Sequence, residues 1–75
     1  MELNAKASLA EMLRQARAEN ERIETYLRGG QAFVGKVIAI GDHSVVIGPL
    51  VGKDFYDVQI RIDDISAISI QTRGK

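Results

Sequence analysis

The stretch FVGKVIAI, residues 33–40, decides how this chain folds. Side chains alternate along residues 31–40 in the manner of a β-strand with one buried face. Gly35 stands inside the run, where a missing side chain permits a sharp bend or the close approach of another backbone. Gly41 and Asp42 follow as a turn signal. The stretch therefore predicts a bent strand that ends in a turn.

Three shorter strands are predicted after this turn. Residues 44–48 form an apolar strand, and a second turn signal follows at residues 51–54. Apolar and polar side chains then alternate along residues 55–62, which is the clearest strand pattern in the chain. Isoleucine next recurs at three-residue intervals, which predicts one tight helical turn before a short final strand. The isoleucines concerned are Ile62, Ile65 and Ile68.

The N-terminal part of the chain predicts a helix over about residues 8–21. Ser8 and Glu11 have the spacing of a capping box, in which the hydroxyl and the carboxylate each satisfy a free backbone N–H. Apolar side chains then recur at steps of four and three and line one helix face. They are Leu9, Leu13 and Ala16.

Residues 22–28 leave two interpretations open. They continue the apolar seam of the helix, and they also alternate as a strand does. Gly29-Gly30 ends the element in both cases, as a helix cap or as a hairpin turn. A helix followed by four or five short antiparallel strands implies a mostly β fold, a small and strongly bent sheet or barrel.

Length and composition limit the classes of protein. The chain has 75 residues, enough for one domain spanning 1–75, and a chain this short hides only ~60% of its unfolded surface. Without cysteine it has no disulfide to supplement the core, so self-association is expected. Ten Lys and Arg balance ten Asp and Glu, which excludes a bulk positive field for nucleic acid. No apolar run reaches the ~20 residues of a membrane span and no signal peptide is evident, so a cytoplasmic protein without membrane contact is expected.

Three segments resemble the motifs of the Sm-like (LSm/Hfq-type) RNA-binding family. Residues 33–40 with Asp42 are similar to the first Sm motif, residues 61–68 are similar to the second, and residues 26–30 resemble the first hairpin of the family. The resemblance covers about residues 8–72 and implies an N-terminal helix on a five-stranded, SH3-like small barrel, with the barrel at about 22–72. It also implies that residues 22–28 are a strand.

The chain departs from the family pattern at the loops. Gly41 adds one residue before Asp42, and Ile62 replaces the glycine usual after the second-motif arginine. Asp63-Asp64 stands where the Hfq type carries a Lys-His pair. These departures bear on RNA binding more than on the fold.

The resemblance implies that single-stranded, U-rich RNA binds at loops beside the pore of a ring, with a role in RNA metabolism or regulation. The residues carried over for this role are Asp42, His43, Ser44, Arg61 and Asp63. Two helix arginines, Arg14 and Arg17, are weaker candidates for an RNA contact at the rim.

Other roles compete for the same residues. His43 also fits an exposed turn position, and Arg61 fits an ion pair with Asp63 or with a neighbouring subunit's Asp57. For Asp63-Asp64 the favoured interpretation is capping of backbone N–H groups at the tight turn. For the helix arginines the favoured interpretation is a solvated face, salt-bridged to nearby glutamates. Those glutamates are Glu11, Glu19 and Glu21.

Assembly into a ring is expected from the family resemblance and from the physics of unpaired sheet edges. Two strands with apolar edges aggregate unless they are paired, and a head-to-tail contact that closes a ring removes both edges. The predicted interface residues are Tyr56, Val58, Ile60, Ile65, Ile68 and Ile70. A homo-oligomeric hexamer or heptamer is expected by analogy, and a pentamer satisfies the same pairing. Phe55, on the polar side of its strand, is expected to be exposed or to contact another subunit.

Catalysis is not expected. Asp42, His43 and Ser44 are triad residue types, but adjacent side chains do not point into a relay. The chain has no phosphate-loop motif and no metal-ligand spacing, so no cofactor, metal or small-molecule substrate is predicted. The alternative to an RNA-binding ring is a structural or adaptor ring that mediates protein–protein contacts with little RNA affinity.

Overall fold

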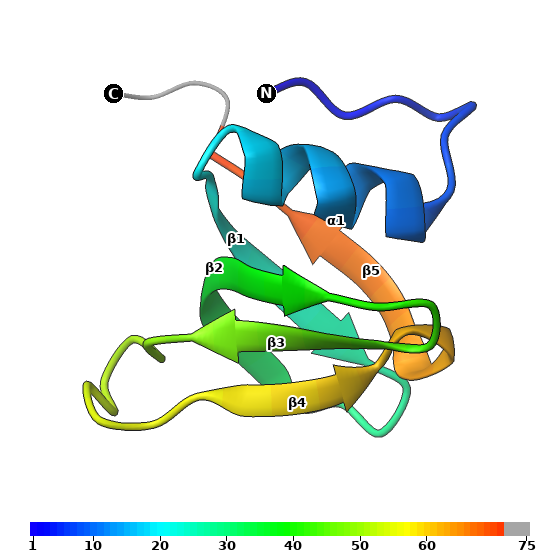
Figure 1. The fold of residues 1–75 in the computed structure, drawn as a ribbon. Helices are drawn as coiled ribbons and strands as arrows, with labels where there is room; N and C mark the ends of the chain where they lie inside the picture. Colours follow the sequence, from blue (N-terminus) through cyan, green and yellow to red (C-terminus); the bar gives the residue numbers. More distant parts are fainter. Residues whose placement is uncertain (72–75) are drawn as a thin grey trace.

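A computed structural model describes residues 1–71 of the chain, and one helix lies across a bent five-stranded sheet (Figure 1). The elements are α1 (Leu9–Ala18), β1 (Arg22–Leu27), β2 (Ala32–Ile40), β3 (Ser44–Gly48), β4 (Val58–Arg61), the 3₁₀ turn η1 (Ile62–Asp64) and β5 (Ile65–Ser69). The sheet order is β4-β3-β2-β1-β5, and every neighbouring pair is antiparallel. The predicted fold class is confirmed, and residues 22–27 are a strand. The predicted barrel end at residue 72 lies outside the described residues.

The helix begins where the capping box predicts. The Glu11 backbone N–H donates to Ser8 Oγ at 3.1 Å, and the Ser8 N–H donates to Glu11 Oε1 at 2.9 Å. The helix ends at Ala18, three residues before the predicted end at 21. The reason is Asn20, whose positive φ of 55° lets the Glu21 N–H donate back to the Ala16 carbonyl at 2.9 Å. This is a left-handed helix cap, a conformation that asparagine tolerates better than most residues.

Strand β2 is bent and serves two neighbours. Its first half, up to Lys36, pairs with β1, and its second half, from Lys36 onward, pairs with β3. The register shifts between Val37 and Ala39, where the strand is irregular. At Gly35 an added Cβ would lie 3.1 Å from the Pro49 carbonyl oxygen and 3.2 Å from the Gly48 nitrogen. The missing side chain therefore permits the close backbone approach that the sequence predicts.

Strand β4 is shorter than the predicted strand over residues 55–62. It begins only at Val58, because Tyr56 is tied into the preceding loop. The Tyr56 N–H donates to the Lys53 carbonyl, and the Tyr56 carbonyl accepts from Leu50 N–H, both at 2.9 Å. Ile62 belongs to the 3₁₀ turn, which confirms the helical turn predicted from the isoleucine spacing.

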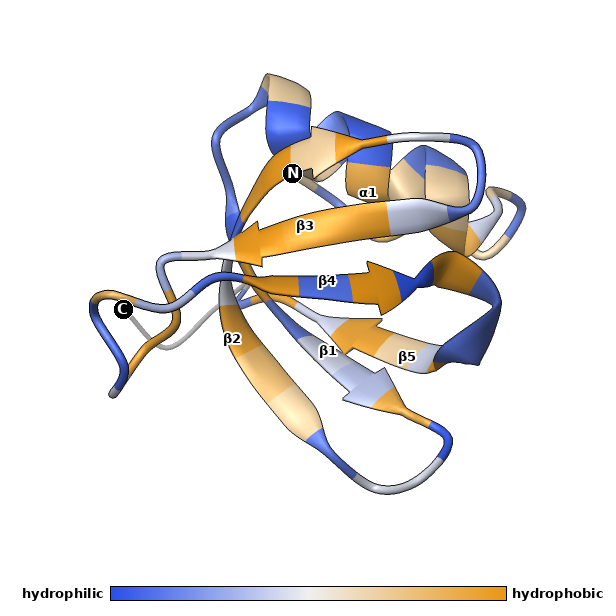
Figure 2. Cartoon of the chain, turned by 60° about the horizontal axis from the view of Figure 1, so that its bottom comes forward, coloured by the Kyte–Doolittle hydropathy of each residue, from blue (hydrophilic) through white to orange (hydrophobic). Residues whose placement is uncertain are grey.

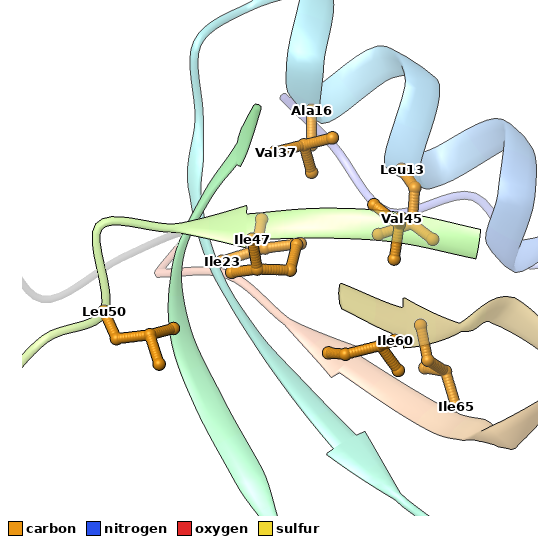
Figure 3. Packing of buried hydrophobic residues seen from close by; sticks show 9 residues of the cluster. All are labelled: Leu13, Ala16, Ile23, Val37, Val45, Ile47, Leu50, Ile60 and Ile65. Carbon is orange, nitrogen blue, oxygen red and sulfur yellow. The ribbon is translucent and has the colours of Figure 1, made fainter. Parts of the chain in front are cut away.

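The core lies between α1 and the concave side of the sheet (Figure 3). Leu13 and Ala16 of α1 are fully buried, as the helix periodicity predicts, and α1 packs against β2 and β5. Ile60 of β4 and Ile65 of β5 lie close together at the far side of the cluster. Thr25 is a buried polar residue, and its hydroxyl donates to the Phe33 carbonyl at 3.3 Å.

Replacing Gly35 tests the bend. We expect Gly35→Ala to lower the free energy of unfolding by about 1–3 kcal/mol, because the new methyl meets backbone atoms that cannot move aside. Gly41→Ala is the matched control, since a Cβ there meets only the Ser44 carbonyl oxygen, at 3.9 Å. Urea denaturation at one fixed protein concentration measures both. Equal stabilities of the two variants would show that Gly35 does not govern the bend.

The capping box makes a pH-dependent contribution to the free energy of unfolding. Hydrogen bonds from the Ser8 backbone N–H, and next from the Ser8 side chain, lower the pKa of Glu11. A lowered folded-state pKa adds stability above the unfolded pKa, and that stability is lost as the pH falls through the folded pKa. We expect wild type to exceed Glu11→Gln in stability at neutral pH, with the difference closing in acid. Denaturation midpoints at pH 7 and pH 3 measure this, and a difference that stays constant would contradict it.

Candidate functional site

Pairing of β3 with β4 brings two distant loops together. Ser44 lies opposite Arg61 in the ladder, so the turn before β3 and the 3₁₀ turn after β4 share one end of the sheet (Figure 1). The Ile62 N–H donates to the His43 carbonyl at 2.9 Å and joins the two loops. The Gly41 N–H donates to the Ser44 carbonyl at 2.9 Å and closes the β2–β3 turn. Backbone hydrogen bonds therefore fix the relative position of these loops.

A cleft of about 260 Å³ lies between the loops, and we call it the loop cleft. Its lining residues are Asp42, His43, Arg61, Ile62 and Asp63. Four of the five predicted pore-side residues are thus brought together, and Ser44 is the exception. Ser44 is half-buried, and its hydroxyl accepts a hydrogen bond from Gln59 Nε2 at 3.0 Å. Ile62 is the lining residue that the sequence interpretation missed, although its place between Arg61 and Asp63 could have indicated it.

The imidazole of His43 and the guanidinium of Arg61 are available for a ligand in the loop cleft. His43 and Arg61 are both exposed. Within residues 1–71 neither side chain has a hydrogen bond or an ion pair, so the predicted intrachain pair of Arg61 with Asp63 is absent there. The alternative pair with a neighbouring subunit's Asp57 stays a prediction.

The predicted capping role of Asp63-Asp64 is wrong. The N-cap position of η1 is held by Arg61, and no side chain caps the turn. Capping requires an acceptor at the N-cap itself, whereas the two aspartates lie inside the turn. Asp63 is therefore exposed in the loop cleft, and the Asp64 backbone carbonyl accepts from the Arg28 N–H at 3.0 Å.

Arg14 and Arg17 line a second hollow, of about 560 Å³, together with Ala18 and Ile40. We call it the rim hollow. The Arg17 Nε–H donates to the Ile38 carbonyl at 3.2 Å, which holds this guanidinium against β2. Both arginines are exposed.

The predicted salt-bridged helix face is not found in the described chain, because the three glutamates have other partners. Glu11 belongs to the capping box. Glu19 accepts from Gln15 Nε2, and this hydrogen bond is the main reason that its pKa is lowered. The Met1 ammonium lies 2.9 Å from Glu21 and 3.3 Å from Glu19, and the hydrogen bond with Glu21 is the main cause of its raised pKa. Among residues 1–71 neither helix arginine therefore forms an ion pair, although Arg14 lies close enough to Glu11 to help lower the pKa of that carboxyl.

The two hollows flank a single turn. Ile40 lines the rim hollow and Asp42 lines the loop cleft, and only Gly41 separates them. Two residues span at most about 7 Å of chain. The linings of the two hollows therefore come close together along the chain at this turn.

The predicted interface residues fall at the two edges of the sheet, but in different environments. Ile60 and Ile65 are only 4% and 5% exposed, so their side chains belong to the core of the chain itself. Val58 and Ile68 are half-buried on β4 and β5, and Ile70 is half-buried just beyond β5. Tyr56 is 63% exposed and precedes β4. At these edges it is the free backbone of β4 and β5 that is available for pairing, more than the side chains of Ile60 and Ile65.

The described residues form neither a metal-binding cluster nor a membrane-spanning helix. Among residues 1–71 no three His, Cys, Asp or Glu side chains gather in a way that could hold a metal ion. No helix in the described part of the chain has the length and apolar character needed to cross a membrane.

Comparison with known proteins gives a fold and no more. No family model and no curated protein sequence matches the chain. A solved structure that resembles it is the 1.55 Å crystal structure of the pleiotropic translational regulator Hfq. The similarity has a TM-score of 0.71 and covers 93% of this chain and all of that one, at 13% sequence identity. The chain therefore has the Hfq/Sm-like fold.

Proposed function

We propose that the protein is a homo-oligomeric, Sm-like ring that binds single-stranded, U-rich RNA without catalysis. The observation that supports this most is the loop cleft, where residues from two distant segments converge with His43 and Arg61 exposed. The similar solved structure is that of a translational regulator, which is consistent with a role in RNA regulation. A hexamer or heptamer is expected by analogy.

The loop cleft has the chemistry to bind a base more than a phosphate. Asp42 and Asp63 supply carboxylate acceptors, which repel phosphate but accept from an N–H such as that of uracil N3. His43 and Arg61 supply a flat ring and a planar donor fork, which stack on a base or donate to its carbonyls. Ile62 adds an apolar wall. The mixture of charges therefore favours an unpaired base with both donors and acceptors.

The rim hollow has the complementary chemistry. Arg14 and Arg17 are cations without a carboxylate partner in the described chain, so they are free to neutralise phosphates. Their position across Gly41 from the loop cleft suits a strand whose base enters the cleft and whose backbone passes over the rim. Repetition around a ring multiplies such weak contacts by raising the effective concentration of each site.

The ring is supported by the sheet edges. β4 and β5 end the sheet on its two sides, so each leaves one row of backbone groups unpaired within the chain. Pairing of β4 in one copy with β5 in the next satisfies both rows in a closed assembly.

A second candidate is a structural or adaptor ring with little RNA affinity. Asp42 and Asp63 place two carboxylates in the loop cleft, and the whole chain has a balanced charge. In this case the ring forms and its ligands are proteins.

Replacing His43 or Arg61 tests the RNA proposal. We expect His43→Ala and Arg61→Ala each to weaken oligo-U binding by about 1–3 kcal/mol, the usual contribution of a stacked base. Fluorescence anisotropy with oligo-U, oligo-A and a mixed strand measures the affinities. Lys36→Ala is the charge-matched control for Arg61, because Lys36 is exposed and lies opposite Gly48, at the other end of β3 from Ser44. No binding of any strand at tens of micromolar protein would favour the adaptor ring, and unchanged affinity in both cleft variants would remove the cleft as the RNA site.

Salt dependence tests the rim separately. Each phosphate contact that is lost lowers the slope of log affinity against log salt by about 0.7 for a single strand. We expect Arg14→Ala and Arg17→Ala each to lower this slope by about 0.7 for every subunit whose arginine contacts the RNA strand. The preference for U over A is expected to stay unchanged. Titrations at three salt concentrations measure it. A changed base preference would place these arginines at the base and not at the backbone.

A further inference from the structure

The loop between β3 and β4, residues 49–57, projects from the body of the domain (Figure 1, yellow-green, at left; Figure 2). It carries three exposed apolar side chains: Phe55 is 99% exposed, Tyr56 63% and Val51 52%. Exposed apolar side chains that gather on one feature, as opposed to being scattered, are typical of an interaction site. The RNA proposal gives this loop no role.

The loop is held in a fixed shape. Leu50 is buried and anchors it, and the Val51 N–H donates to the Val34 carbonyl at 3.0 Å. Hydrogen bonds from Leu50 to Tyr56 and from Tyr56 to Lys53 close the turn, and the Lys53 ammonium lies 5.8 Å from the centre of the Tyr56 ring. Phe55 is thus presented from an ordered support. Binding by such a residue loses little conformational entropy on association.

The position of Phe55 in the chain relates it to a sheet edge. Phe55 lies three residues before Val58, where edge strand β4 begins, and the opposite edge is β5. All strand pairs within the chain are antiparallel. If β4 pairs in the same sense with β5 of a neighbouring copy, its N-terminal end lies beside the C-terminal end of that β5. Phe55 then reaches the region of Ser69 and the residues that follow it.

A hollow of about 380 Å³ lies at that end of β5, and we call it the β5 hollow. The start of β1, Val34 of β2 and residues 69–71 line it. Val34 and Ile70 give it apolar walls, and Arg22 lies among its lining residues. On the loop, Asp54 directly precedes Phe55 and Asp57 follows it by two residues. The hollow is lined by one cation, Arg22, and one carboxylate, Glu24, so Arg22 is the side chain that can pair with an aspartate of the loop.

We propose that Phe55 of one copy inserts into the β5 hollow of the neighbouring copy and anchors the subunit interface. The inference rests on the ring proposed above and specifies what holds it together. Backbone pairing of β4 with β5 sets the register, and the aromatic ring supplies buried apolar area. Asp54 faces the neighbouring copy's Arg22 at the edge of the contact.

Tryptophan fluorescence tests the burial of this position. The chain contains no Trp, so Phe55→Trp introduces a single fluorophore at a site that is exposed in the isolated chain. As the protein concentration rises and light scattering reports assembly, we expect its emission to shift to shorter wavelength. Leu3→Trp is the control, because Leu3 is 51% exposed and lies outside both surfaces, and its emission is expected to stay constant.

Association strength and cross-linking complete the test. We expect Phe55→Ala to raise the midpoint concentration of assembly at least about 30-fold, the effect of a hot-spot residue, and Val51→Ala to raise it less than about 5-fold. The chain has no cysteine, so a mixture of Phe55→Cys and Gln71→Cys proteins is expected to give disulfide-linked dimers that neither protein forms alone.

The outcomes separate the two proposals. A wild-type protein that stays monomeric at every concentration overturns the ring and the anchor together. A wild-type ring in which Phe55→Trp keeps its long-wavelength emission and Phe55→Ala assembles normally overturns the anchor and leaves the ring standing. Normal assembly of Phe55→Ala with weaker oligo-U binding also overturns the anchor, and assigns Phe55 to RNA.

Discussion

The close approach of β2 to the end of β3 at Gly35 is the constraint on which the rest of the structure depends. Because the Pro49 carbonyl and the Gly48 nitrogen pass where a side chain would stand, β2 bends and pairs with β1 along one half and with β3 along the other. A straight strand of nine residues would pair along its whole length with both neighbours and give a flatter sheet. The bend instead wraps the sheet around Val37, Val45 and Ile47, and α1 covers the open side. It also leaves β4 and β5 as the two edges, so the same constraint that forms the core also determines where another copy can pair.

The position of the candidate site follows from this strand arrangement and does not depend on the particular residues of the loops. Once β3 pairs with β4, Ser44 lies opposite Arg61. The turn that precedes Ser44 and the 3₁₀ turn that follows Arg61 must then lie side by side. The backbone bond from Ile62 to His43 then closes the gap. The position of the loop cleft is therefore a property of the fold, whereas its chemistry belongs to the few side chains on the two turns. Departures from the Sm-like motif pattern at Ile62 and Asp63 change the side chains that line the cleft and leave its place unchanged.

Local sequence rules predicted most of the fold, because its signals are short in range. The capping box, the strand at residues 44–48 and the turn at Ile62 each depend on neighbours within a few residues, whereas the local pattern of residues 22–28 fits a helix as well as the observed strand. The failures lie where distant groups compete. The arginines at 14 and 17 were expected to pair with nearby glutamates, but the Met1 ammonium and the capping box engage those carboxylates first. Tyr56 has the alternation of a strand, yet hydrogen bonds with Leu50 and Lys53 keep it in the loop. Of the site, the resemblance to the Sm-like family implied which loops converge, and the sequence did not predict that Asp63 would be left uncapped and exposed in the cleft.

Balanced net charge does not argue against nucleic-acid binding once the charges are located. A uniform neutral surface gives no long-range attraction, but here the acids near α1 are engaged while Arg14 and Arg17 are exposed, so a local positive area remains beside Ile40. Two further exposed carboxylates, Asp42 and Asp63, lie in the loop cleft, where they disfavour phosphate and suit the N–H groups of a base. Under the proposed function, separating the two chemistries across one turn would let a weakly charged chain discriminate between base and backbone. In the proposed ring, such a site is weak in each copy and gains affinity by repetition, so the proposed interface between copies matters as much as the cleft itself.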